Sequence, residues 1–168
     1  MATTYEKIAT QTLSSNATTI DFNSIPGTFT DIRLVVVALK QSGAANFYPY
    51  MQVNGDTASN YSMTFVRGNG SSSSTGRNTS VTEWQLAHEN TTVNTPQLLT
   101  VDMFSYAGST FKSCLVERNA DFNGSGQVAR QVGLWRSTSA ITSISLFDPF
   151  GNGYGTGTIA TLYGILKA

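Results

Sequence analysis

Few side chains in this sequence are equipped for nucleophilic or acid–base chemistry. A serine or cysteine nucleophile needs a neighbouring base, usually a histidine, and the chain holds a single histidine, His88, in the polar stretch 88–92. No Gly-x-Ser-x-Gly motif occurs. One histidine and one cysteine, Cys114, are too few for a conventional zinc site. We therefore expect no catalytic residue, no metal and no cofactor, and we expect Cys114 to be a buried, unreactive thiol.

Carboxylates offer the remaining route to catalysis, because two of them flanking a glycosidic bond suffice for its hydrolysis. Their spacing leaves open whether any two meet, and the candidates are Glu83, Glu89, Asp102, Glu117, Asp121 and Asp148. Glu117 stands beside Arg118 in a strand-like segment, which favours an ion pair across strands or between subunits. Asp121 and Asn123 offer oxygen ligands for calcium, but a turn stabilised by these two side chains is the preferred interpretation.

Aromatic side chains are better candidates for function, because Trp and Tyr dominate the binding energy of interfaces and can stack on sugar rings. Most aromatic residues must fill the core. We single out Tyr154, since its glycine neighbours leave it few side chains to pack against. The residues that we expect to contact a partner are Tyr154, Trp84, Tyr48, Arg77 and Phe150.

Composition and charge exclude several classes of partner. The 168 residues fit one domain, 1–168, and ten basic and ten acidic residues give a formal net charge of zero. The Lys and Arg residues are scattered, which argues against nucleic acid as a partner. No signal peptide opens the chain and no apolar run approaches the roughly 18 residues that span a bilayer, so we expect no membrane contact and synthesis in a reducing cytoplasm. Weak electrostatic repulsion between copies favours a homo-oligomer.

The elements that must position these residues are β-strands, because apolar residues alternate or run in short β-branched stretches. The pattern predicts an all-β, antiparallel β-sandwich, jelly-roll-like, with about ten short strands. The strand candidates are 18–22, 31–40, 48–53, 61–67, 80–86, 98–104, 112–119, 127–135, 141–147 and 158–166.

Four segments have individual predictions. Segment 1–13 is expected to be an arm or an edge strand. The apolar run in 31–40 predicts a central strand that is covered on both faces. Segment 68–77 is rich in Gly and Ser, which predicts a mobile loop or one that orders against a partner. The Gly-rich segment 151–157 allows the same interpretation, although tight turns alone would explain it.

Several segments of the sequence resemble a widespread group of structural proteins of tailed bacteriophages. They are spread over nearly the whole chain and comprise 5–10, 22–26, 29–35, 104–110, 133–144 and 160–165. Members of the group occur alone or as domains of longer fibre-like proteins, and no catalytic motif belongs to them. The resemblance implies a virion protein, either head-decorating or tail-associated, with bacterial cells as the eventual target.

Two functions are therefore expected from this sequence. In the first, the protein is a capsid decoration or cement subunit, assembled in the bacterial host cytoplasm, that bridges capsomers and binds other virion proteins. In the second, it is a tail fibre tip or adhesin domain that binds a glycan or protein of the host surface. The absence of a coiled-coil or β-helical shaft favours decoration, whereas the fibre-like relatives favour the adhesin. A lone lectin-like module and a hydrolase are weaker alternatives.

Overall fold

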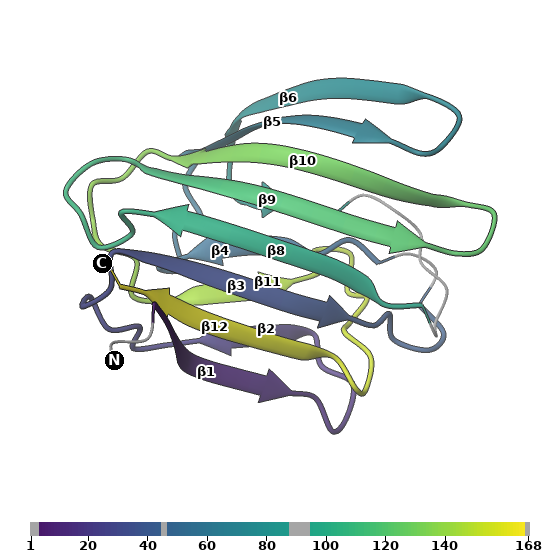
Figure 1. Ribbon diagram of the computed structural model, residues 1–168, viewed down its shortest axis with the longest axis horizontal. Helices are drawn as coiled ribbons and strands as arrows, with labels where there is room; N and C mark the ends of the chain where they lie inside the picture. The colour runs from purple at the N-terminus through teal and green to yellow at the C-terminus, as the bar shows by residue number, and fades with distance from the viewer. Residues whose placement is uncertain (1–3, 45–46, 88–94, 167–168) are drawn as a thin grey trace.

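Two antiparallel β-sheets packed face to face form the molecule (Figure 1). The computed structural model describes residues 4–44, 47–87 and 95–166. These residues form twelve strands and no α-helix, so the predicted all-β sandwich is confirmed, with two strands more than the ten predicted. No helix long and apolar enough to cross a membrane occurs among them.

The two sheets differ in width. The large sheet has eight strands in the order β1 (Tyr5–Thr12), β12 (Ile159–Ile165), β3 (Asp31–Ala38), β8 (Gln97–Phe104), β9 (Lys112–Asp121), β10 (Gly126–Trp135), β5 (Tyr61–Gly68) and β6 (Ser73–Val81). The small sheet has four strands in the order β2 (Thr19–Phe22), β11 (Ile144–Phe147), β4 (Tyr50–Val53) and β7 (Trp84–Gln85). Because β1 is an outermost strand, segment 1–13 does supply an edge strand.

Strand β3 is an interior strand of the large sheet, between β12 and β8, in agreement with the prediction from its apolar run. Its buried residues alternate with more exposed ones, and the buried set is Ile32, Leu34, Val36 and Ala38. The other set points away from the small sheet, and Val37 in this set is 38% exposed. Coverage on both faces, which the apolar run predicts, is therefore wrong. The second layer lies against one face of β3 only, and β-branched residues suit the pleated surface on either face.

The largest core side chains are aromatic. The Tyr61 ring packs edge to face on Trp84 with ring centroids 5.0 Å apart, and stacks on Trp135 at 6.4 Å. The Tyr61 hydroxyl donates a hydrogen bond to the Val53 carbonyl at 3.2 Å, and Nε1 of Trp135 donates to Oδ2 of Asp56 at 2.7 Å. These partners satisfy the polar ends of the rings, which makes their burial favourable.

Two inward-facing residues of β9 carry ionisable groups, and one of them, Lys112, is unusual for a core. Cys114 is fully buried, as predicted, and burial raises the pKa of its thiol from 9.0 to about 12. Lys112 is also buried, and burial lowers the pKa of its ammonium group. That group donates hydrogen bonds to the carbonyls of Gly108 at 2.7 Å, of Thr138 at 3.3 Å and of Thr110. The ammonium group therefore links the loop before β9 to the segment after β10 through hydrogen bonds.

Segment 68–77 is not the loop that its composition predicts. Strand β6 begins at Ser73 and pairs with β5, so only 69–72 form the turn. The Asn69 side chain caps this turn, because its Oδ1 accepts backbone hydrogen bonds from Ser71 at 3.1 Å and Ser72 at 2.8 Å. A hydroxyl-rich segment suffices as an edge strand because backbone pairing holds it and neither face must be apolar.

Tyr154, in the Gly-rich segment 151–157, is fully buried. Its amide donates to the Ala17 carbonyl at 2.8 Å, and its ring packs edge to face on Phe47 at 5.0 Å. A Cβ on Gly153 would lie 2.6 Å from the Ala17 carbonyl oxygen, so glycine permits this close approach. The expectation that Tyr154 lacks side chains to pack against is therefore wrong, because the neighbouring glycines bring other segments closer.

Candidate interaction surface

The outer face of the large sheet points away from the small sheet and carries most of the large apolar side chains that are exposed to solvent. Ten such side chains are exposed among the described residues, and only Phe111 and Phe150 lie outside this face. The other eight define the outer apolar face, and they are Tyr5, Val37, Val66, Leu98, Phe104, Val128, Val132 and Ile159. Their concentration on one face is unusual, because exposed apolar side chains of a monomer are normally scattered.

Strand register places part of this set in a continuous row. Ile159 of β12 is opposite Val37 of β3, which in turn is opposite Leu98 of β8. Directly opposed side chains on the same face of a sheet lie about 5 Å apart, so the three form one apolar stripe. An open groove of about 710 Å³ adjoins the stripe and is lined by Val37, Leu98 and Val128 and by the tips of two hairpins, at 68–70 and 124–126.

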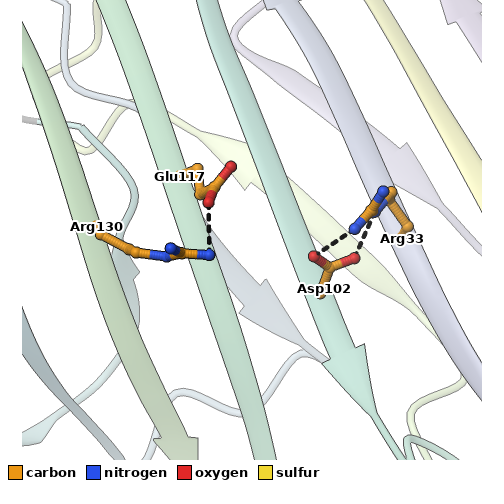
Figure 2. Close-up of polar contacts among 4 residues, drawn as sticks. All are labelled: Arg33, Asp102, Glu117 and Arg130. Atoms are coloured by element: carbon orange, nitrogen blue, oxygen red, sulfur yellow. Dashed lines mark hydrogen bonds and ion pairs between the residues drawn. The ribbon is translucent and has the colours of Figure 1, made fainter.

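The middle of the outer face carries two ion pairs, and in each pair the two opposite charges compensate each other within the chain. The Arg33 guanidinium donates two hydrogen bonds to Asp102, from Nε at 2.5 Å and from Nη2 at 2.8 Å. On the two neighbouring strands, Nη2 of Arg130 lies 2.7 Å from Oε1 of Glu117. Figure 2 shows both pairs, and each joins directly opposed residues of adjacent strands. The predicted ion pair of Glu117 thus exists across strands, with Arg130 as the partner.

Arg33 is also in contact with an aromatic pair at the edge of the same face. Its guanidinium carbon lies 5.7 Å from the centroid of the Tyr5 ring, and the rings of Tyr5 and Tyr163 are 6.5 Å apart in an edge-to-face arrangement. The hydrogen bonds that Arg33 donates to Asp102 raise the pKa of Arg33 above its usual value, although burial acts in the opposite direction. Arg33 is therefore engaged within the chain by both Asp102 and the Tyr5 ring.

The residues that the sequence predicts to contact a partner fall into three places. Trp84 and Tyr154 are completely buried, so their expected exposure is wrong: each packs against another aromatic ring in the core. Tyr48 and Phe150 come together, with ring centroids 5.4 Å apart, and Phe150 is 65% exposed. Arg77 on β6 is exposed and donates from Nε to Oγ1 of Thr64 at 3.3 Å.

The Tyr48–Phe150 pair is held by a buried carboxylate. Oδ2 of Asp148 accepts a hydrogen bond from the Tyr48 amide at 2.8 Å, and Oδ1 accepts one from the Phe150 amide at 2.8 Å. Asp148 is 6% exposed, so one side chain fixes two loop backbones from beneath. The structure thus assigns Asp148, a candidate acid, to positioning an exposed aromatic pair.

The other candidates for chemistry have structural partners or lie outside the described residues. His88 and Glu89 are in the undescribed stretch 88–94. Oδ1 of Asp121 accepts a hydrogen bond from the Asn123 amide at 2.9 Å, which is the turn preferred over a calcium site. Within the described ranges, no cluster of three or more His, Cys, Asp or Glu side chains is suited to hold a metal.

The valines and Leu98 of the outer face were missed by sequence reasoning. Val128 and Val132 occupy alternate positions of β10 between buried residues, so the apolar positions do not distinguish the two faces of that strand. An excess of apolar residues over what one buried face requires was the available signal, and it was interpreted as double coverage in 31–40.

Comparisons of the chain with models of protein families, with characterised proteins and with solved structures found no significant match.

Proposed function

We propose that this protein is a non-enzymatic structural subunit of a tailed-phage virion that stabilises the head by bridging capsomers. The observation that carries the proposal is the outer apolar face, a surface whose burial requires another protein. Removing apolar surface from water contributes about 25 cal/mol per Å², so a face of this kind stabilises contacts without any catalytic group. The resemblance to phage structural proteins supplies the virion as the setting and other virion proteins as the partners.

We infer further that the sandwich is a jelly roll into which two hairpins are inserted. Strands β1-β12-β3-β8 and the small sheet β2-β11-β4-β7 have the interleaved order that two Greek keys produce. The remaining strands are the hairpins β5–β6 and β9–β10, and both extend the large sheet beyond β8. These hairpins provide half the width of the large sheet, which supports an assembly role because they enlarge the surface more than the core.

Head decoration would act by repetition. Each subunit contributes modest contacts, and many subunits on one shell add up to a large stabilisation. A formal net charge of zero helps, because neighbouring copies on the shell do not repel each other strongly.

Binding to heads tests this function directly. Purified protein is mixed with phage heads that lack it, and cosedimentation and the heat resistance of the heads are followed. Saturable binding together with raised heat resistance is the expected result. Failure to bind heads removes the decoration role and leaves the tail role to be tested.

A tail adhesin is the second candidate, and the Tyr48–Phe150 pair favours it. An exposed ring whose backbone is hydrogen-bonded to Asp148 resembles the aromatic anchors that bind sugar rings or protein partners. The test is binding of the protein to host cells and to a glycan panel, with Phe150→Ala as the variant. Phe111→Ala is the matched control, because Phe111 is 54% exposed and lies outside the pair. Loss of binding in Phe150→Ala alone would support the adhesin.

A further inference from the structure

We propose that the outer apolar face of the large sheet packs against the same face of a second copy of this chain, as a two-fold symmetric, sheet-on-sheet dimer. The inference rests on the proposed assembly function and specifies its first partner. Two sheets that pack in this way lie about 10 Å apart with interdigitating side chains.

The size of the face suits a dimer. Eight strands spaced about 4.8 Å apart make the large sheet about 34 Å wide, and a strand of eight residues is about 27 Å long. The face therefore covers roughly 900 Å², close to the 800 Å² that each partner contributes to a stable interface of standard size. The apolar residues extend over most of this width, from Tyr5 on β1 at one edge to Val66 on β5, the strand next to the opposite edge.

The charges of the face suit an identical partner. Arg33 pairs with Asp102 and Arg130 pairs with Glu117, so the middle of the face presents paired charges of both signs. In the middle of the face an identical partner adds two more compensated pairs, while the exposed cations Lys7 and Arg77 lie on the outermost strands β1 and β6, at the rim of the interface. A strongly acidic or basic partner would find its counter-charges already engaged, and burying unpaired charge is costly.

Two-fold symmetry explains why a single face of the molecule can form the whole dimer interface. In a two-fold dimer the same patch serves both subunits, so a self-complementary surface needs no second site on the molecule. The apolar stripe of Ile159, Val37 and Leu98 is close to one end of the strands, and Val132 and Phe104 lie further along the sheet. Apolar groups therefore occur on both sides of the central ion pairs, as face-to-face packing of two copies requires.

The molar mass of the full chain in solution tests the proposal, by light scattering after size-exclusion chromatography over a range of concentrations. A single chain is 18.0 kDa, and the expected mass is twice that value. The test variant carries Val128→Lys and Val132→Lys, which put four unpaired charges into the dimer interface. We expect the dissociation constant to rise by about a hundredfold or more.

Two further variants make the outcome unambiguous. Thr19→Lys is the matched control, because Thr19 is an exposed strand residue of the small sheet, and this variant should remain a dimer. Val128→Thr with Val132→Thr keeps β-branched side chains and serves if the double lysine variant does not fold. This variant should also raise the dissociation constant of the dimer.

Three results decide the matter. A dimer that only the substitutions at 128 and 132 dissociate supports the proposal. A dimer that survives those substitutions in folded protein overturns it, since the contact then lies elsewhere. A monomer at all concentrations also overturns it. If that monomer binds heads and the double lysine variant does not, the face belongs to a capsid protein and the proposed function survives.

Discussion

At the scale of single residues, some strand positions have room for hydrogen only. A Cβ on Gly133 would lie 2.6 Å from Sγ of Cys114 and 2.7 Å from Nε1 of Trp84, and both atoms belong to side chains that the core holds in place. Cores resist such extra volume because neighbouring side chains must leave their preferred rotamers.

Gly133→Ala should therefore lower the free energy of unfolding by about 1–3 kcal/mol, measured by urea denaturation. Gly27→Ala is the matched control, because the nearest atom to its added Cβ would be 3.8 Å away, and its effect should be small. Equal effects of the two substitutions would show that strand β10 relaxes around the added methyl group.

The buried thiol predicts how stability depends on alkaline pH. Burial raises the pKa of Cys114 from 9.0 to about 12 and that of Tyr61 from 10.0 to about 12. The folded protein then keeps protons that the unfolded chain releases, so stability is intact below pH 9 and falls as pH rises toward 12. Each such group should contribute a slope of about 1.4 kcal/mol per pH unit within its window.

Cys114→Ala isolates the contribution of the thiol. Between pH 9 and 10 the unfolded thiol titrates before the tyrosines do, so the variant should lose less stability than the wild type in this interval. The contribution of Lys112 to the pH dependence of stability has the opposite sign, because burial lowers its pKa. Lys112 is present in both proteins, so its contribution cancels in the comparison. Urea denaturation from pH 8 to 11 measures the difference, and parallel curves would contradict it.

At the scale of elements, the turn between β4 and β5 connects parts of the molecule that are distant in sequence. Asn54 and Gly55 have φ values of 53° and 63°, both left-handed, and the Asp56 amide closes this β-turn by donating to the Val53 carbonyl at 3.0 Å. The Asn54 side chain also donates to the Ala140 carbonyl at 2.7 Å and accepts from the Thr142 amide at 2.8 Å. One residue thus sets the turn and fastens the segment before β11.

Substitutions of Asn54 should separate these two roles. Asn54→Gly keeps the left-handed backbone and loses the side-chain hydrogen bonds, whereas Asn54→Ala loses both. We expect Asn54→Ala to cost about 2–4 kcal/mol and Asn54→Gly about 1 kcal/mol less than that, measured as free energies of unfolding. If Asn54→Gly were equally destabilising, the hydrogen bonds alone would account for the effect.

Elements were predictable from the sequence where one face is apolar and the other polar. The central part of strand β8 buries Leu99, Val101 and Met103 and turns Thr100 and Asp102 outward, and the predicted bounds of the strand differ from the observed ones by one residue. Strand β6 was not predicted, because a hydroxyl-rich edge strand has the composition of a linker and is defined only by pairing with β5. Pairing between distant segments leaves no periodic signal in either of them.

The candidate surface was less predictable than the strands. An outward valine such as Val128 has the same residue type as a buried one, and only the choice of the face against which the second layer packs decides which valines are covered. The choice of face depends on how strands that are distant in the sequence pair within the eight-stranded and four-stranded sheets. Aromatic residues were the natural site candidates, yet Trp84 and Tyr154 were drawn into the core by their large apolar area.

At the scale of the whole molecule, two exposed surfaces differ in size and in chemical character. The outer face of the large sheet is broad and apolar with paired charges, while Tyr48 and Phe150 form a small aromatic site outside that face. Self-association through the first would leave the second available. Assembly and ligand contact can thus be combined in one subunit, and the proposed head and tail roles need not use the same residues.

A dimer built on the outer apolar face should couple folding to association. If the folded state is dimeric and the unfolded state monomeric, the melting temperature must rise with protein concentration. A hundredfold increase in concentration should raise it by about 4 °C for a chain of this size, and ammonium sulfate should strengthen the effect because it favours apolar burial.

Differential scanning calorimetry of the wild type and of the Val128→Lys, Val132→Lys variant measures this coupling. The wild type should show the concentration dependence and the variant should not, while both unfold in a single cooperative transition. A wild-type melting temperature that is independent of concentration would contradict coupled association. A dependence that persists in the variant would instead place the contact on another face, because the lysines would then remain solvated when two chains meet.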